Sequence, residues 1–121
     1  MDGYNSMLDN IFSLAEIKTN MKWIDGRPIY KKTVDTGALP SSSGDKQINH
    51  NISNLDFVIH IEGFALNPLT KANLPLPNVA PNKTYDLGLW SDNTIIDISA
   101  GTNRSAYSVS YVTLLYVKTT D

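Results

Sequence analysis

The sequence predicts an all-β fold, an antiparallel β-sandwich of jelly-roll-like type, preceded by a short N-terminal helix. From residue 21 onward, apolar and polar residues alternate with a period of two, and turn residues separate the alternating stretches. Before that point, apolar residues recur at spacings of three and four. We therefore expect a helical or stalk segment over residues 1–20 and a sandwich head domain over residues 21–121.

Length, charge and cysteine content narrow the class of protein. The chain has 121 residues, 10 basic and 12 acidic side chains, no cysteine and a formal net charge of −2. This length suits one domain, and the charge argues against a nucleic-acid partner bound through its phosphates. Without cysteine, disulfides, Cys-ligated metals and thiol nucleophiles are excluded. No apolar run approaches the roughly 18 residues that span a bilayer, so we expect no membrane insertion and synthesis in the cytoplasm.

The helical pattern covers residues 7–15. A helix this short is marginal in water, so its apolar stripe needs a partner surface. Either the helix folds back on the domain, or identical copies associate through the stripe. For self-association the candidate contacts are Leu8, Ile11 and Leu14.

The first hairpin is expected over residues 23–30. Asp25-Gly26 is a preferred pair for a two-residue type I′ turn, which places Trp23 opposite Pro28. Because proline cannot donate a ladder hydrogen bond, the second strand is expected to start at Pro28 or to lie at an edge.

The middle of the chain reads as a loop, a strand and a proline-rich segment. Residues 37–49 are rich in Ser, Gly and Asp and predict a surface loop, whereas residues 56–62 predict a strand. Four prolines within residues 67–83 exclude a helix and a central strand. That segment either contains a short edge strand around residues 72–74 or has a functional role.

The second hairpin is expected over residues 85–99, with Asp92-Asn93 as a two-residue turn. Leu89 then faces Ile96, and Leu87 faces Ile98, on an apolar face that belongs to the core. The opposite face is mostly polar and carries the following residues: Asp86, Gly88, Trp90, Ile95 and Asp97.

The last strand is expected over residues 106–118 and has two partly apolar faces. One face starts polar and becomes apolar at Val112, Leu114 and Tyr116. Either a sandwich or an oligomer interface would cover such a face, and we name these three residues as candidate interface positions.

Signals of enzymatic chemistry are poor. The two histidines, His50 and His60, belong to no metalloprotease motif, and neither a nucleophile elbow nor a phosphate-binding glycine loop is present. His60 and Glu62 share a strand face that is expected to be solvated. We therefore predict no catalytic residue, no cofactor and no metal site.

Acidic residues beside a tryptophan suggest ligand binding instead. Trp90 is expected to pack against a partner subunit, to stack on a sugar ring or to lie under the proline-rich loop. Our candidate ligand-binding residues are Trp90 with the polar residues around it: Asp86, Asp97, Asp92 and Asn93.

Several segments resemble tail-fibre, baseplate and "minor structural" proteins of phages and prophages of Gram-positive bacteria. Residues 23–33 are similar to the W-I-D-G-K-P-I-Y-x-K-T segment of those proteins. Further agreement follows in order at residues 37–40, 50–52, 104–107 and 111–121. The resemblance covers about residues 16–121, although residues 62–90 have no matching segment.

This resemblance implies a C-terminal receptor-binding head of a virion fibre, commonly trimeric, that meets the host surface. It implies no catalytic residue, and it places the protein in the virion after synthesis in the bacterial host cytoplasm. The expected partners are other copies of the chain, other virion proteins and a host cell-wall polysaccharide or other surface glycan. The alternatives are a structural module that docks another viral protein and, more distantly, a small glycan-active enzyme.

Overall fold

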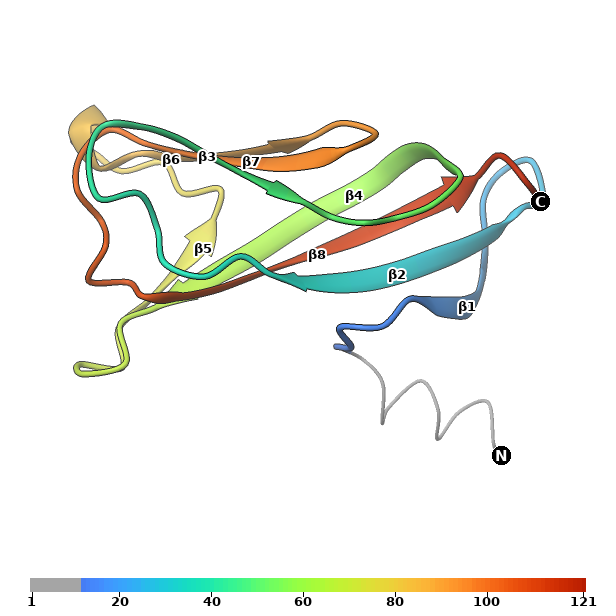
Figure 1. Ribbon diagram of the computed structural model, residues 1–121, viewed down its shortest axis with the longest axis horizontal. Coiled ribbons are helices and arrows are strands. Elements are labelled where there is room, and N and C mark those ends of the chain that lie inside the picture. Colours follow the sequence, from blue (N-terminus) through green and yellow to red (C-terminus); the bar gives the residue numbers. More distant parts are fainter. Residues whose placement is uncertain (1–11) are drawn as a thin grey trace.

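The computed structural model describes residues 12–121, which form two antiparallel sheets packed face to face (Figure 1). One sheet has five strands in the order β1-β2-β8-β4-β5, and the other has three in the order β3-β7-β6. The elements are β1 (Ile17–Lys22), β2 (Pro28–Asp35), β3 (Gly44–Asn49), β4 (Leu55–Leu66), β5 (Asn73–Leu76), the 3₁₀ helix η1 (Lys83–Tyr85), β6 (Leu87–Ser91), β7 (Ile95–Ala100) and β8 (Val109–Lys118). The expectation of an all-β, antiparallel fold is confirmed.

The core lies between the two sheets. Strand β8 is central in the larger sheet and β7 is central in the smaller one, and alternate side chains of each strand enter the core. The residues without exposed surface that these two strands contribute to the core cluster are Val112, Leu114, Tyr116, Ile96 and Ile98. The three candidate interface positions on β8 are thus wrong as interface residues, because the smaller sheet covers them within one chain.

The N-terminal helix is not seen in the described residues. Residues 12–15 form bends, while Met7, Leu8 and Ile11 lie outside the described part of the chain. The carbonyl of Ser13 accepts a hydrogen bond of 2.9 Å from the Thr33 amide. The Ser13 hydroxyl also accepts from the Ala15 amide, which is a local bond that competes with a helix. This segment therefore runs along β2 of the larger sheet.

A partly buried polar cluster ties Glu16, just before β1, to the end of β8. The Tyr116 hydroxyl donates a 2.6 Å hydrogen bond to Glu16, and Lys118 pairs with the same carboxylate at 2.9 Å. Burial, together with Glu16, raises the pKa of Tyr116 well above its usual range. The Lys118 ammonium also lies 5.0 Å from the centre of the Tyr30 ring.

The first hairpin has a longer loop than expected. Pro28 does begin β2, but its partner is Lys22 rather than Trp23. A turn closes from the Gly26 amide to the Trp23 carbonyl, and Gly26 then takes a φ of 92°. This is the arrangement of a three-residue loop with a glycine bulge. Such a loop needs one residue in the left-handed backbone conformation, whereas a type I′ turn needs two.

Strand β4 contains a bulge that exchanges its two faces. Val58 pairs with Tyr116 and His60 pairs with Leu115, so Ile59 is an extra residue in β4. In a regular strand Phe57, Ile59 and Ile61 would share one face, but the extra residue separates Phe57 from Ile61. Ile61 packs against the core, while Phe57 precedes the bulge and is 37% exposed.

Strands form in the segment expected to be a surface loop and in the proline-rich segment. Residues 44–49 form β3, and residues 73–76 form β5 at the edge of the larger sheet. The edge-strand alternative for the proline-rich segment is thus confirmed. Pro75 is tolerated in β5 because this strand has a neighbour on one side only.

The strand register of the second hairpin differs by two residues from the predicted register. Leu89 pairs with Ile98, and Leu87 pairs with Ala100, so the loop is longer than Asp92-Asn93. The shift is even, and the apolar face therefore still points into the core, as predicted. Trp90 acquires Asp97 as its direct neighbour in place of Ile95.

The described residues contain no helix that is long and apolar enough to cross a membrane.

Candidate functional site

An open groove of about 590 Å³ lies between β4 and the β6–β7 hairpin. Strand β5 pairs only with residues 63–66 of β4, so the earlier half of β4 keeps a free edge. Strand β6 is the edge of the smaller sheet and faces this free half. The groove residues are Phe57, Val58, Ile59, His60 and Ile61 from β4, and Leu89, Trp90, Ser91, Asp92 and Asn93 from the hairpin.

Trp90 is the largest exposed side chain of the groove. It is 47% exposed, although Leu89 beside it packs against the core. The alternation of β6 explains the difference, since Leu89 points inward and Trp90 points to the outer face. An aromatic ring held on a strand offers a rigid apolar plane with one hydrogen-bond donor.

The loop after Trp90 is fixed by hydrogen bonds from both sides. The Asp92 carboxylate accepts from the amides of Thr94 at 2.8 Å and Ile95 at 2.9 Å. These bonds, that of Ile95 first, lower the pKa of Asp92. With its carboxylate charged and tied into the turn, Asp92 presents a defined oxygen acceptor at the end of the groove.

His50 anchors the same loop from beneath. Its Nδ1 accepts a hydrogen bond of 3.2 Å from the Ile52 amide, so the ring proton is on Nε2. Nε2 then donates to the Asp92 carbonyl at 2.9 Å, and the His50 amide donates to the Thr94 carbonyl. This buried histidine is a positioning residue that holds the hairpin loop against the start of β4.

The structure brings together three of the five predicted ligand-binding residues: Trp90, Asp92 and Asn93 line the groove. Asp86 does not belong to it, because its carboxylate accepts a 2.7 Å hydrogen bond from the Ala80 amide and closes the loop after β5. Asp97 lies beside Trp90 on the neighbouring strand but is fully buried. Neither acid lines the groove.

Sequence reasoning missed the β4 side of the groove. Phe57 and His60 line it even though they lie far from Trp90 in the chain. The Phe57 ring stands edge-on to Trp23 at 5.8 Å, and the Arg27 guanidinium lies 5.6 Å from its centre. Only the pairing of β4 with β8 could reveal this position, because no local pattern indicates the bulge.

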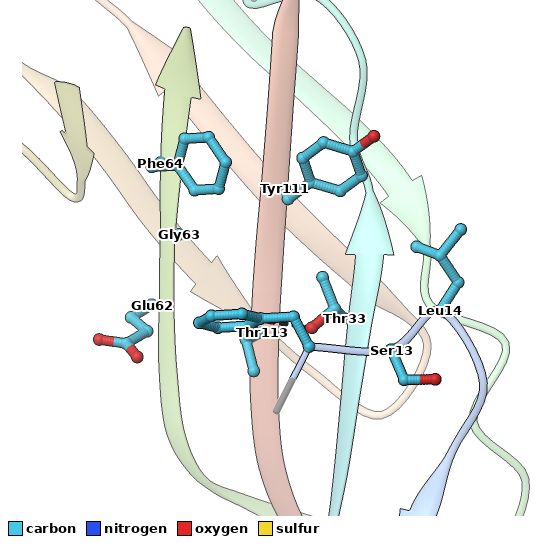
Figure 2. A pocket seen from close by; sticks show the side chains of 9 residues that line it. Ser13, Leu14, Thr33, Glu62, Gly63, Phe64, Tyr111 and Thr113 are labelled. Carbon is cyan, nitrogen blue, oxygen red and sulfur yellow. Dashed lines mark hydrogen bonds between the residues drawn. The ribbon is translucent and has the colours of Figure 1, made fainter. Parts of the chain in front are cut away.

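A second hollow, of about 400 Å³, lies on the outer face of the larger sheet. Figure 2 shows the rings of Phe64 and Tyr111 side by side, with Leu14 at the opposite margin. The exposed fractions of Phe12, Leu14 and Phe64 are 65%, 61% and 45%. We call this surface the outer hollow, and its residues are Phe12, Ser13, Leu14, Thr33, Glu62, Gly63, Phe64, Tyr111 and Thr113.

The histidine and carboxylate pair on β4 is solvent-exposed. His60 and Glu62 approach to 3.6 Å and are 55% and 63% exposed. Within residues 12–121, no three histidine or carboxylate side chains converge on one point.

No family model matches the chain, and searches of curated proteins and of solved structures gave no match.

Proposed function

We propose that this chain is a receptor-binding head domain of a phage tail fibre or baseplate, and that it adheres to a host-surface glycan through the groove beside Trp90. The half-exposed indole at the rim of an open, partly polar groove carries this proposal. The phage context rests on the resemblance of the two ends of the sequence to such proteins. A jelly-roll-like sandwich is part of the proposal, since the chain passes between the sheets four times, between β2 and β3, β3 and β4, β5 and β6, and β7 and β8.

The groove has the size and chemistry of a sugar site. Ligand sites usually measure about 300–1,000 Å³ and combine apolar walls with a few placed polar groups. Here Trp90 and Phe57 supply ring planes, while Asp92, Asn93 and His60 supply hydrogen-bonding groups. The net charge of −2 suits a neutral polysaccharide better than a polyanion such as teichoic acid.

The proposed head acts as a homo-oligomer, a trimer as in the fibre heads that it resembles. We place the contact at the outer hollow, where Phe12, Leu14 and Phe64 expose apolar surface. Exposed apolar patches of this kind are typical of subunit interfaces. In an oligomer, several grooves that each bind the glycan weakly would together give strong attachment. A shallow site in each chain is therefore sufficient.

The proposal is tested by co-sedimentation of the whole chain with purified Gram-positive cell walls. Trp90→Ala is expected to lower retention roughly tenfold or more, as is typical of a central aromatic contact. Tyr85→Ala is the matched control, because Tyr85 is 46% exposed but lies outside the groove. Its retention is expected to equal that of the unaltered chain.

Two results would contradict glycan adhesion. Equal retention of Trp90→Ala and the unaltered chain would show that the groove is not the glycan-binding site. No retention of the unaltered chain on any cell wall would favour the alternative function, in which the exposed Trp90 docks another virion protein, since exposed tryptophans are common at protein interfaces.

A further inference from the structure

Asp97 occupies the centre of the outer face of the three-stranded sheet. It lies on the middle strand β7, with Gln47 of β3 opposite it on one side and Trp90 of β6 on the other. Its side chain is fully buried even though the outer face of the sheet is turned away from the core. A buried carboxyl group is costly unless its oxygens are satisfied.

The hydrogen bonds of Asp97 are incomplete. Its Oδ2 accepts one long bond, of 3.4 Å, from the Gln47 amide. Its Oδ1 is buried and has no hydrogen-bond partner. Leaving a buried charged acceptor unpaired costs more than leaving a neutral one, so a missing partner is the simplest explanation of this geometry.

A second acidic residue lies near Asp97. Asp45 stands on β3 two residues before Gln47, on the same face and diagonally opposite Asp97. A cation held between the two carboxylates, or a proton shared by them, would offset their mutual repulsion.

We propose that Asp97, Asp45 and Gln47 bind a divalent cation of the Ca²⁺ type. Hard cations take oxygen ligands, and two carboxylates with one amide oxygen supply them while waters complete the shell. Rotation of the Gln47 amide exchanges its nitrogen for its oxygen, so this side chain serves as a ligand without moving its backbone. In this site a neutral amide takes the place of the third acidic ligand that metal sites commonly have. The site therefore does not contain a group of three acidic side chains.

The site is independent of glycan adhesion but adjoins its groove. Asp97 and Trp90 are direct cross-strand neighbours, so an ion on Asp97 would fix the strand that carries the indole. Cation binding and cell-wall retention are therefore measured separately. Loss of one does not decide the other.

The test is a CaCl₂ titration of the chelator-treated full chain, followed by calorimetry and by thermal unfolding. One ion is expected to bind per chain, with a dissociation constant on the order of 10⁻⁴–10⁻³ M because few charged ligands are present. The unfolding temperature is expected to rise by about 2–5 °C at saturation. Both effects should disappear in Asp97→Asn and in Asp45→Asn.

Two comparisons keep the experiment decisive. Asp45 is exposed, so Asp45→Asn is expected to fold even if Asp97→Asn does not. Glu62→Gln removes an exposed acid elsewhere and is expected to bind the ion normally. No heat and no thermal shift with Ca²⁺, Mg²⁺ or Mn²⁺, or the same shift in the asparagine variants, would overturn the proposal and leave a shared proton as the explanation.

Discussion

Leu114 illustrates how the role of one side chain depends on what covers it. Its strand has apolar residues on both faces, which suits a sandwich core and a subunit interface equally well. In the structure, Leu114 has no exposed surface and belongs to the cluster between the sheets. Its contribution is therefore to the stability of a single chain.

We predict that Leu114→Ala lowers the free energy of unfolding by about 2–5 kcal/mol, through lost burial and the cavity that remains. Leu69→Ala is the control, because Leu69 is 92% exposed. Its effect is expected within about 0.5 kcal/mol of zero. Urea unfolding measures both changes in stability. Light scattering of the folded Leu114→Ala variant should give the same subunit number as the unaltered chain. A change in subunit number without a loss of stability would contradict a core position.

Gly63 shows a constraint that only the assembled sheet imposes. A Cβ at this position would lie 2.6 Å from the Tyr111 carbonyl oxygen and 3.0 Å from a methyl group of Val112. The backbone of β8 therefore approaches β4 too closely for any side chain. In the sequence, Gly63 merely interrupts a strand pattern.

At the scale of the elements, the β6–β7 hairpin depends on Asp92. The carboxylate receives two backbone hydrogen bonds that close the loop, and they lower its pKa from the usual value of 3.8. A carboxyl group whose pKa is lower in the folded state stabilises the fold above its usual pKa. That contribution is lost as the pH falls through the folded-state value.

We predict that Asp92→Ala destabilises the chain at pH 7, and that this difference shrinks as the pH falls below the usual pKa of 3.8. Urea midpoints at several pH values measure it. Asn93→Ala changes the next residue of the loop and is expected to show no such pH dependence. A difference that stays constant down to strongly acidic pH would show that the charge of Asp92 has no part in holding the loop.

The hairpins also show which local predictions succeed. Turn residues correctly located the chain reversals near Gly26 and Asp92, because loop chemistry is local. Loop lengths were wrong by one or two residues, since cross-strand pairing and the bulge in β4 set the register. At β6–β7 the even shift preserved the predicted core face. In β4, by contrast, two register shifts, between Leu55 and Phe57 and between Val58 and His60, interrupt the alternation of faces.

At the scale of the whole molecule, the two candidate surfaces lie on different parts of the sandwich. The groove beside Trp90 lies between β4 and the β6–β7 hairpin, and the outer hollow lies over β2, β8 and β4. An oligomer that covers the outer hollow therefore involves a set of residues separate from that of the groove. This separation would allow the proposed assembly and the proposed adhesion to be altered independently.

We predict that Leu14→Lys combined with Phe64→Lys reduces the molar mass in light scattering to that of a single chain. Charges placed in a buried apolar contact are strongly unfavourable, whereas both positions are exposed in the single chain and should tolerate lysine. Val79→Lys changes a residue that is 86% exposed outside the outer hollow, and it should leave the mass unchanged. A single-chain mass for the unaltered protein at micromolar concentration would refute the oligomer.

The sequence by itself determined the all-β class, the antiparallel pairing and the inward faces of the β6–β7 hairpin. These follow from a period of two and from turn residues, which are properties of neighbouring positions in the chain. The sequence could also place Trp90, Asp92 and Asn93 near one another, since they lie within one hairpin.

Only the tertiary structure decided which apolar faces are covered and which polar groups are isolated. It placed Leu114 in the core, brought Phe57 and His60 to Trp90, and buried Asp97 beside Gln47 with one oxygen unpaired. These outcomes depend on pairing between segments 30 or more residues apart, including the bulge of β4. The physical reason is that burial and register belong to the contact between sheets and strands, and no stretch of sequence contains that contact on its own.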